Sequence, residues 1–222
     1  GVAPHYADAH YNLGNVHLAN LDYQLAAEYY LQALELEPKN RPALYHLALC
    51  RQKQRAYNEA LDLMNTLVES SDVENTQERI LALGGRANIL RDLGQFDAGL
   101  LDIETALTAA PTDLALMGNK ALTLQHAGSL DEAIVVYQEA VSAYPNNELV
   151  QSNLAHALLL AGQFKDGWRE FEARLDEPKI AAKRMNMPGV AWQGESLAGK
   201  HILLWCEQGL GDTLQFIRYV PN

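Results

Sequence analysis

The chain has 222 residues, 48% of them apolar, which is enough to build a continuous hydrophobic core. Its 28 acidic and 17 basic residues give a formal net charge of −11, which argues against binding to nucleic acid or to an anionic membrane surface. No apolar run approaches the roughly 18 residues of a membrane span, and the N-terminus is not typical of a signal peptide. Cys50 and Cys206 are expected in different modules, so a structural disulfide is not expected and the predicted location is cytoplasmic.

A 34-residue period organises most of the chain. Pro4, Pro38, Pro111 and Pro145 are 34, 73 and 34 residues apart, so the longest gap equals two periods plus five residues. Self-similarity at a fixed period is typical of a repeat solenoid. We predict repeats at residues 7–40, 41–74, 80–113, 114–147 and 148–178, with the five extra residues near 75–79 and the end of a preceding repeat at 1–6.

Within each repeat, counted from its first residue, small and large residues recur at fixed places. Small residues dominate the eighth, twentieth and twenty-seventh places, where they let two helices approach closely, and larger ones such as Tyr30 recur at the twenty-fourth. Apolar residues at helical spacing predict a first helix, such as Ala9–Ala19, followed by a turn and a second helix that ends before the proline. In the turns, Gly94, Gly128 and Gly162 suit a left-handed helix end.

This pattern resembles the tetratricopeptide repeat (TPR) family over residues 7–178. The resemblance implies an all-α, right-handed superhelical solenoid of about five helix-turn-helix repeats. Two repeats depart from the pattern. The second has Leu67 at a small place and Asp72 in place of the proline, and the fifth has Arg174 at a small place, as a modified end of the stack would.

The family resemblance also implies a ligand-binding concave face, lined by the first helices at places two, five, six, nine, twelve and thirteen. Asparagine recurs at places six and nine. Because an amide carries a donor and an acceptor, a row of amides can hold an extended peptide by its backbone. Such a ladder resembles the repeats of O-linked N-acetylglucosamine transferases; the alternative is that asparagine is simply common near the Leu-Gly of the first helix. The candidate peptide-binding residues are Tyr11, Asn12, Asn15, Tyr45, His46, Asn88, Asn119, Asn153 and His156.

Two other kinds of site are not expected in the repeats. A carboxylate clamp for chaperone C-termini needs Lys or Arg at concave places of adjacent repeats. The corresponding places hold Tyr11, Asn15, His46, Leu81 and Gly85. His10 and His17 occupy packing places, with no cysteine or carboxylate at ligand spacing, so we predict no metal site and no cofactor in this chain.

A different pattern comes after the repeats. Residues 179–199 are predicted to form a linker, and the apolar run His201–Cys206 suits a buried parallel strand. A glycine-rich turn at 207–212 and a helix over Thr213–Tyr219 would come next. We therefore predict the first βα unit of a truncated Rossmann-like α/β domain at 200–222. Since one βα unit cannot cover both faces of its strand, we interpret the chain as a segment of a larger protein.

The order GW-x-x-F-E-x-R, W-x-G, GK-x-I-L-L and EQGLGDT-x-QF-x-RY-x-P resembles bacterial TPR proteins with a C-terminal glycosyltransferase-like domain of the heptosyltransferase-type GT-B fold. The resemblance implies that Asp212 is an acceptor-side catalytic base. It also implies that Gly209 and Gly211 let the backbone approach the acceptor or its phosphate. The alternative for Asp212 is a helix N-cap, in a capping box with Gln215.

We therefore predict a protein- or peptide-binding scaffold that is inactive alone and recognises the acceptor or a partner for a parental glycosyltransferase. The nucleotide-sugar of that parent would bind in a second domain that this chain lacks. The alternative is a non-enzymatic assembly scaffold with a degenerate α/β tail, and the sequence after Asn222 would separate the two. Because its strand edges are unpaired, the segment 200–222 is also expected to dock on the repeats or to self-associate.

Overall fold

The computed structural model describes residues 5–70 and 76–176, and beyond them residues 182, 186, 188–190, 192 and 194–204. The chain divides into two compact units, Gly1–Phe171 and Glu172–Asn222. The first unit contains the repeats, and the second begins with a short 3₁₀ helix, Glu172–Asp176.

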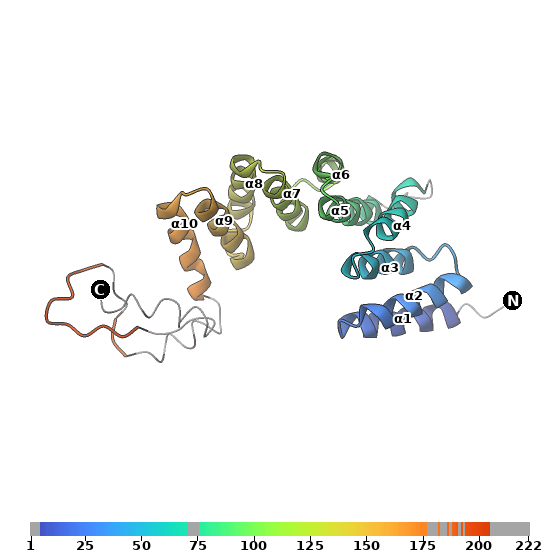
Figure 1. Cartoon of the computed structure of the whole chain (residues 1–222), viewed down its shortest axis with the longest axis horizontal. Helices are drawn as coiled ribbons and strands as arrows, with labels where there is room; N and C mark the ends of the chain where they lie inside the picture. Colours follow the sequence, from blue (N-terminus) through green and yellow to red (C-terminus); the bar gives the residue numbers. More distant parts are fainter. Residues whose placement is uncertain are drawn as a thin grey trace. The chain divides into compact units, whose positions relative to one another are not determined.

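Ten α-helices make up the described part of the first unit, and each packs against the next helix in sequence (Figure 1). The odd-numbered helices are the first helices of the repeats and the even-numbered ones are the second helices. Their bounds are α1 His5–Ala19, α2 Tyr23–Leu36, α3 Arg41–Lys53, α4 Tyr57–Glu69, α5 Thr76–Asp92, α6 Phe96–Ala109, α7 Leu114–His126, α8 Leu130–Ala143, α9 Glu148–Leu160 and α10 Phe164–Phe171.

The turn inside each repeat has one conformation, set at the fifteenth place. Gly94, Gly128 and Gly162 have φ values of 74°, 88° and 76°, as predicted for a left-handed helix end. In the first two repeats the same place holds Leu21 and Arg55, with φ values of 61° and 62°. Left-handed backbone costs a residue with a side chain roughly 1–2 kcal/mol, so the first two repeats accept local strain to keep the common turn.

Small residues occur where two helices meet, as the sequence predicts. A Cβ added to Gly14, at the eighth place, would lie 2.5 Å from Cε1 of Tyr30 at the twenty-fourth. A Cβ on Gly167, at the twentieth place, would lie 2.8 Å from the Leu159 side chain. In both repeats the bulk of one helix fills the space left by the small residue of the other.

The hydrophobic core is divided into clusters that run along the stack. One cluster combines Tyr30 and Ala33 of α2 with Leu47 and Cys50 of α3. The other four likewise join a second helix to the first helix of the following repeat. The core is therefore built by contacts between neighbouring repeats as well as within them, which is the energetic basis of a solenoid.

The extra residues between the second and third repeats extend a helix. Helix α5 has 17 residues and begins at Thr76, whereas α3, α7 and α9 have 13 each. Arg41 of α3 holds this extension: its Nε lies 2.8 Å from Oε2 of Glu78, and its Nη2 donates to the backbone oxygen of Leu67 at 3.1 Å. Arg41 also donates to Ser70 Oγ. One guanidinium thus joins the start of α3, the end of α4 and the start of α5.

A buried ion pair replaces an apolar contact in the third repeat. The seventh place, which is Leu47 in the second repeat, holds Arg86, and its guanidinium binds both carboxylate oxygens of Asp102 on α6 at 2.7 Å. The side chain of Asp102 is 8% exposed. Hydrogen bonding to Asp102 raises the pKa of Arg86, so the pair stays charged. Arg86 also donates to Asn65 of α4 at 3.2 Å, which connects three consecutive helices.

The predicted α/β start after the repeats is wrong. The described residues of the predicted strand, His201–Leu204, have no regular structure, and the part of the chain that the structure describes contains no strand. Ile202, Leu203 and Leu204 are 44%, 55% and 59% exposed, whereas a parallel strand would be buried on both faces. An apolar run alone does not fix a strand, because a strand needs neighbours for its hydrogen bonds.

The other predictions for the tail concern residues that the structure mostly leaves undescribed. Gly209, Gly211, Asp212 and the predicted helix at 213–219 lie outside the described residues. In the predicted linker, the indole Nε1 of Trp192 donates to the backbone oxygen of Glu195 at 2.8 Å, which closes a short local loop.

We predict opposite effects for alanine at two helix-interior glycines. Gly14→Ala should lower the free energy of unfolding, because displacing the fully buried Tyr30 costs about 1–3 kcal/mol and outweighs about 1 kcal/mol of gained helix propensity. Gly118→Ala is the matched control. Its added Cβ would meet no atom within 4 Å, so the variant should gain up to about 1 kcal/mol. Urea denaturation measures both, and a Gly14→Ala protein as stable as the parent would contradict the packing described here.

Candidate functional site

The first helices present an almost uncharged surface. We call the residues at places two, five, six, nine, twelve and thirteen of α1, α3, α5, α7 and α9 the first-helix face. Only Asp8, Lys53, Arg91 and Asp92 among them carry a formal charge, two of each sign, although the whole chain carries −11. All nine candidate residues predicted from the sequence belong to this face. A ligand for it must therefore be recognised by amides, aromatic rings and shape rather than by charge.

Four of the candidate residues come together in the first two repeats. Tyr11, Tyr45 and His46 surround Tyr30: the rings of Tyr30 and His46 stack with centroids 5.6 Å apart, and Tyr11 lies 5.9 Å from Tyr30 and 5.8 Å from His46. Tyr45 meets His46 edge-on at 5.6 Å. The Tyr30 hydroxyl donates to Oδ1 of Asn15 at 2.8 Å. These residues form a continuous aromatic and amide cluster across α1, α2 and α3.

His46 is a neutral imidazole within this cluster. Its Nδ1 is buried and has no hydrogen-bond partner among the described residues. Burial lowers the pKa of His46, and burial also raises the pKa of the Tyr30 hydroxyl, which therefore stays protonated and able to donate. The cluster is thus uncharged near neutral pH.

A pocket of about 320 Å³ opens beside His46. We call it the Leu81 pocket. It lies between α3, α4 and α5, and four of its residues, Pro42, Tyr45, His46 and Leu81, belong to the first-helix face. Its full lining is Arg41, Pro42, Tyr45, His46, Leu67, Glu78, Leu81 and Ala82.

The asparagines of the first-helix face divide into two groups. Asn15 and Asn88, at place nine, are engaged within the protein: Asn15 accepts from Tyr30, and Asn88 accepts from Nη1 of Arg91 at 2.9 Å. Asn12, Asn119 and Asn153, all at place six, make no side-chain hydrogen bond within the described residues. Place six therefore offers free amides in the first, fourth and fifth repeats.

The remaining candidate residue, His156, lies at the far end of the series. Its ring meets Phe171 edge-on with centroids 5.4 Å apart, and its Nδ1 lies 3.5 Å from Ser152 Oγ. Asn88, Asn119, Asn153 and His156 stand on three separate helices. The structure does not gather them into one cluster, as expected for positions that repeat along a stack.

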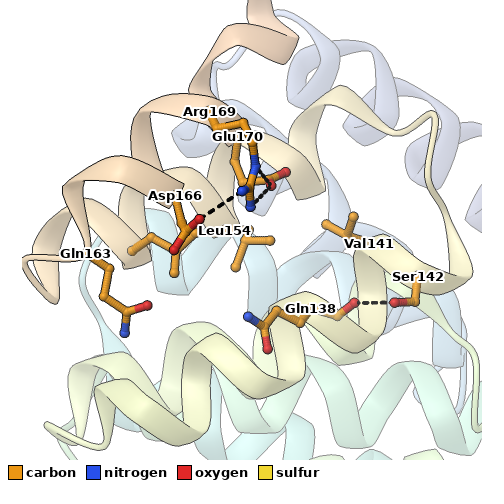
Figure 2. A pocket seen from close by; sticks show the side chains of 9 residues that line it. Gln138, Val141, Ser142, Leu154, Gln163, Asp166, Arg169 and Glu170 are labelled. Atoms are coloured by element: carbon orange, nitrogen blue, oxygen red, sulfur yellow. Dashed lines mark hydrogen bonds and ion pairs between the residues drawn. The ribbon is translucent and has the colours of Figure 1, made fainter.

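A second pocket, of about 360 Å³, lies between α8, α9 and α10 (Figure 2). Figure 2 shows Arg169 held between two carboxylates of the pocket: Nη1 lies 2.8 Å from Oδ1 of Asp166, and Nη2 lies 3.2 Å from Oε1 of Glu170. Gln138 and Ser142 of α8 line the opposite side. Because the Arg169 guanidinium is already neutralised, it offers no free positive charge to an anionic ligand.

The histidines near the N-terminus are packing residues. His10 and His17 both stack on Tyr29, with ring centroids 6.3 Å and 5.2 Å apart. Nδ1 of His10 is buried without a hydrogen-bond partner among the described residues. No group of three or more His, Cys, Asp or Glu with metal-binding geometry occurs within the part of the chain that the structure describes.

The repeat pattern predicts only a packing role for Tyr30 and indicates neither Arg41 nor the Leu81 pocket. A signal for Tyr30 was present, since glycine at place eight makes room for a ring whose hydroxyl can then reach the first helix. Arg41 carries no such signal, because its partner Glu78 belongs to the insertion, which has no counterpart in the other repeats. The pocket depends on where side chains of three helices end, which spacing alone does not show.

Stacked helix pairs with an open face on the first helices define a repeat solenoid of the scaffold type. Family models of the tetratricopeptide repeat match residues 7–40, 42–71, 85–148 and 124–173. The chain therefore carries tetratricopeptide repeats. Protein FlbA of Caulobacter vibrioides is 28% identical over 143 residues, which cover 64% of this chain. The match spans only 18% of the length of FlbA.

Solved structures with the same fold come from diverse organisms. A putative kinesin light chain from Podospora anserina with TPR-like repeats has a TM-score of 0.69, 18% identity, and coverage of 84% of this chain and 100% of that one. MamA from Desulfovibrio magneticus RS-1 has a TM-score of 0.62 and 16% identity, with coverage of 83% of this chain and 98% of that one. The TPR protein TTC0263 of Thermus thermophilus has a TM-score of 0.60 and 22% identity, with coverage of 81% of this chain and 95% of that one. At these identities the likeness shows the fold alone.

We predict that His46 makes the fold sensitive to mild acid. Because its pKa is lowered in the folded state, the unfolded chain binds a proton below about pH 6.5 more readily than the native protein does. The free energy of unfolding should therefore fall as the pH drops from neutral to the folded pKa. His46→Gln removes this contribution, so the stability difference between the parent and the variant should shrink on acidification.

The control for this prediction is His126→Gln, since His126 is exposed on the same face. Denaturant unfolding at a series of pH values from neutral to mildly acidic measures all three proteins. The stability of His126→Gln should track that of the parent. Parallel curves for the parent and His46→Gln would show that the cluster tolerates an imidazolium.

Proposed function

We propose that the solenoid is an interaction scaffold that binds an extended polypeptide along its first-helix face. The observation that carries the proposal is the set of free amides at place six, on Asn12, Asn119 and Asn153, on a face of zero formal charge. Each amide can donate to a peptide carbonyl and accept from a peptide N–H. Backbone recognition of this kind needs no particular side chain in the partner.

The division between the asparagines supports this use of place six. At place nine the Asn15 carbonyl oxygen is occupied by Tyr30 and that of Asn88 by Arg91, so these side chains also hold the protein together. The three amides at place six make no side-chain hydrogen bond within the described residues. A partner can therefore bind them without breaking an internal hydrogen bond, and removing them should leave the fold intact.

The triple substitution Asn12→Ala, Asn119→Ala and Asn153→Ala should weaken binding of pooled, unstructured random-sequence peptides by at least about tenfold. Each lost hydrogen bond costs about 0.5–1.5 kcal/mol, and these losses accumulate along the ligand. Fluorescence anisotropy with labelled peptides measures the affinity, and thermal unfolding should change little.

The matched control alters three exposed asparagines that lie off the face and have no side-chain partner within the described residues: Asn20→Ala, Asn58→Ala and Asn146→Ala. This variant should bind as the parent does. Equal affinities of the two triple variants would remove the amide row as the binding device.

A second candidate is acceptor recognition for a parental glycosyltransferase. It is supported by the ordered sequence pattern from Gly167 to Pro221, in which Asp212 is the proposed acceptor-side base and Gly209 and Gly211 would let the backbone approach the acceptor. The nucleotide-sugar would then bind outside this chain. Calorimetry of the chain with UDP-, GDP- and ADP-sugars should show no binding, whereas the longer parent should transfer sugar and lose that activity on Asp212→Asn. A parent that transfers no sugar would leave only the scaffold role.

Two further properties belong to this proposal. The cytoplasm is the proposed location, supported by Cys50, a free buried thiol whose pKa burial raises to about 11. None of the helices that the structure describes combines the length and apolar character needed to cross a bilayer.

Self-association through residues 200–222 is proposed because Ile202, Leu203 and Leu204 are exposed, and light scattering at increasing concentration would test it.

A further inference from the structure

The amide row of the first-helix face is interrupted in the middle of the stack. Place six holds asparagine in the first, fourth and fifth repeats, but His46 in the second and Gly85 in the third. The Leu81 pocket opens at this interruption. An extended chain held by Asn12 at one end and by Asn119 and Asn153 at the other must therefore pass the pocket.

The glycine that interrupts the row lies against Tyr45, one of the residues that line the pocket. A Cβ on Gly85 would lie 2.7 Å from Cε of Met64 and 3.1 Å from Cε2 of Tyr45. No larger residue, asparagine included, fits there without moving both side chains. The third repeat thus has no amide at this place, because the side chains of Met64 and of Tyr45, which lines the pocket, approach the backbone of α5 there.

The charged groups that line the pocket leave no free charge inside it. Arg41 is neutralised by Glu78 at 2.8 Å and further bonded to the backbone oxygen of Leu67, so its donors are directed into the protein. His46 is a neutral ring stacked on Tyr30. A charged side chain entering the pocket would lose its hydration and gain no partner, which is costly.

Apolar surface at the rim is left open to solvent. Leu81 is 49% exposed, although it borders a pocket whose other apolar lining residues are Pro42, Tyr45, Leu67 and Ala82. Covering such surface stabilises a complex in proportion to the area buried. A volume of about 320 Å³ is at the lower limit of ligand pockets, which run from roughly 300 to 1,000 Å³. It therefore suits one large side chain better than an extended ligand.

We propose that the Leu81 pocket binds a single large apolar side chain of the polypeptide that lies along the first-helix face. The inference rests on the proposed peptide-binding function and adds selectivity to it. The amides hold any extended backbone, and the pocket selects partners with an aliphatic or aromatic residue in the register that faces the second and third repeats.

The test uses unstructured peptides of glycine, serine and threonine with one variable central residue, measured by fluorescence anisotropy. The parent chain should bind peptides with central Leu, Met or Phe about 10- to 100-fold more tightly than those with Ala, Asp or Lys. Leu81→Lys should abolish this preference. Leu149→Lys is the matched control, because Leu149 occupies place two of the fifth repeat and is 70% exposed, and it should keep the preference.

The outcomes separate the pocket from the amide row. The triple asparagine variant should weaken binding of every peptide but leave the apolar preference intact. Suppose that the triple asparagine variant weakens binding. If the parent then shows no apolar preference, or if Leu81→Lys retains the apolar preference of the parent, the pocket inference fails and the proposed function stands. If the triple variant binds normally and Leu81→Lys loses the preference, the amide row fails. Absence of binding to all peptides, or a dimer that Leu81→Lys dissociates, overturns the pocket inference.

Discussion

The packing of each second helix onto the first helix of the next repeat is the contact on which the rest of this structure depends. Within each repeat, small residues at the eighth, twentieth and twenty-seventh places let the two helices pack closely enough to present that surface to the next repeat, as the 2.5 Å approach that a Cβ on Gly14 of α1 would make to Tyr30 of α2 shows. Because every repeat meets its neighbour in the same way, each place keeps the same orientation along the stack. Equivalent side chains therefore form rows. Such a row can bind an extended polypeptide, because the groups of a polypeptide backbone also repeat at a regular spacing.

Charged residues are distributed unevenly between the first-helix face and the rest of the described helices. The acidic residues of the described helices lie mainly on second helices, while the first-helix face holds two acids and two bases. An acidic exterior keeps a solenoid soluble and resists unspecific association. A neutral face lets amides and rings act without competition from ions. The internal ion pairs Arg41–Glu78 and Arg86–Asp102 add no free charge to the first-helix face, since each guanidinium is bound to a carboxylate within the protein.

Periodicity predicted the helices, the turns and the small packing places, because these depend on spacing within a repeat. Gly94, Gly128 and Gly162 have the predicted left-handed conformation for this reason. Spacing did not predict contacts between unlike repeats, such as Arg41 with Glu78, nor that Tyr30 would occupy the carbonyl oxygen of Asn15. It also failed for His201–Leu204. A strand is defined by its neighbours, and an apolar run carries no information about whether those neighbours exist.

The most informative positions are those where the repeat departs from its own pattern. Helix-interior glycine costs roughly 1 kcal/mol relative to alanine, so Gly85 requires a reason within the structure. The reason is steric, since Met64 and Tyr45 occupy the space of its side chain. Gly118, at place five of the next first helix, has no such reason: a Cβ there would meet open space. Packing therefore explains the glycine at Gly85, whereas nothing in the described structure requires one at Gly118.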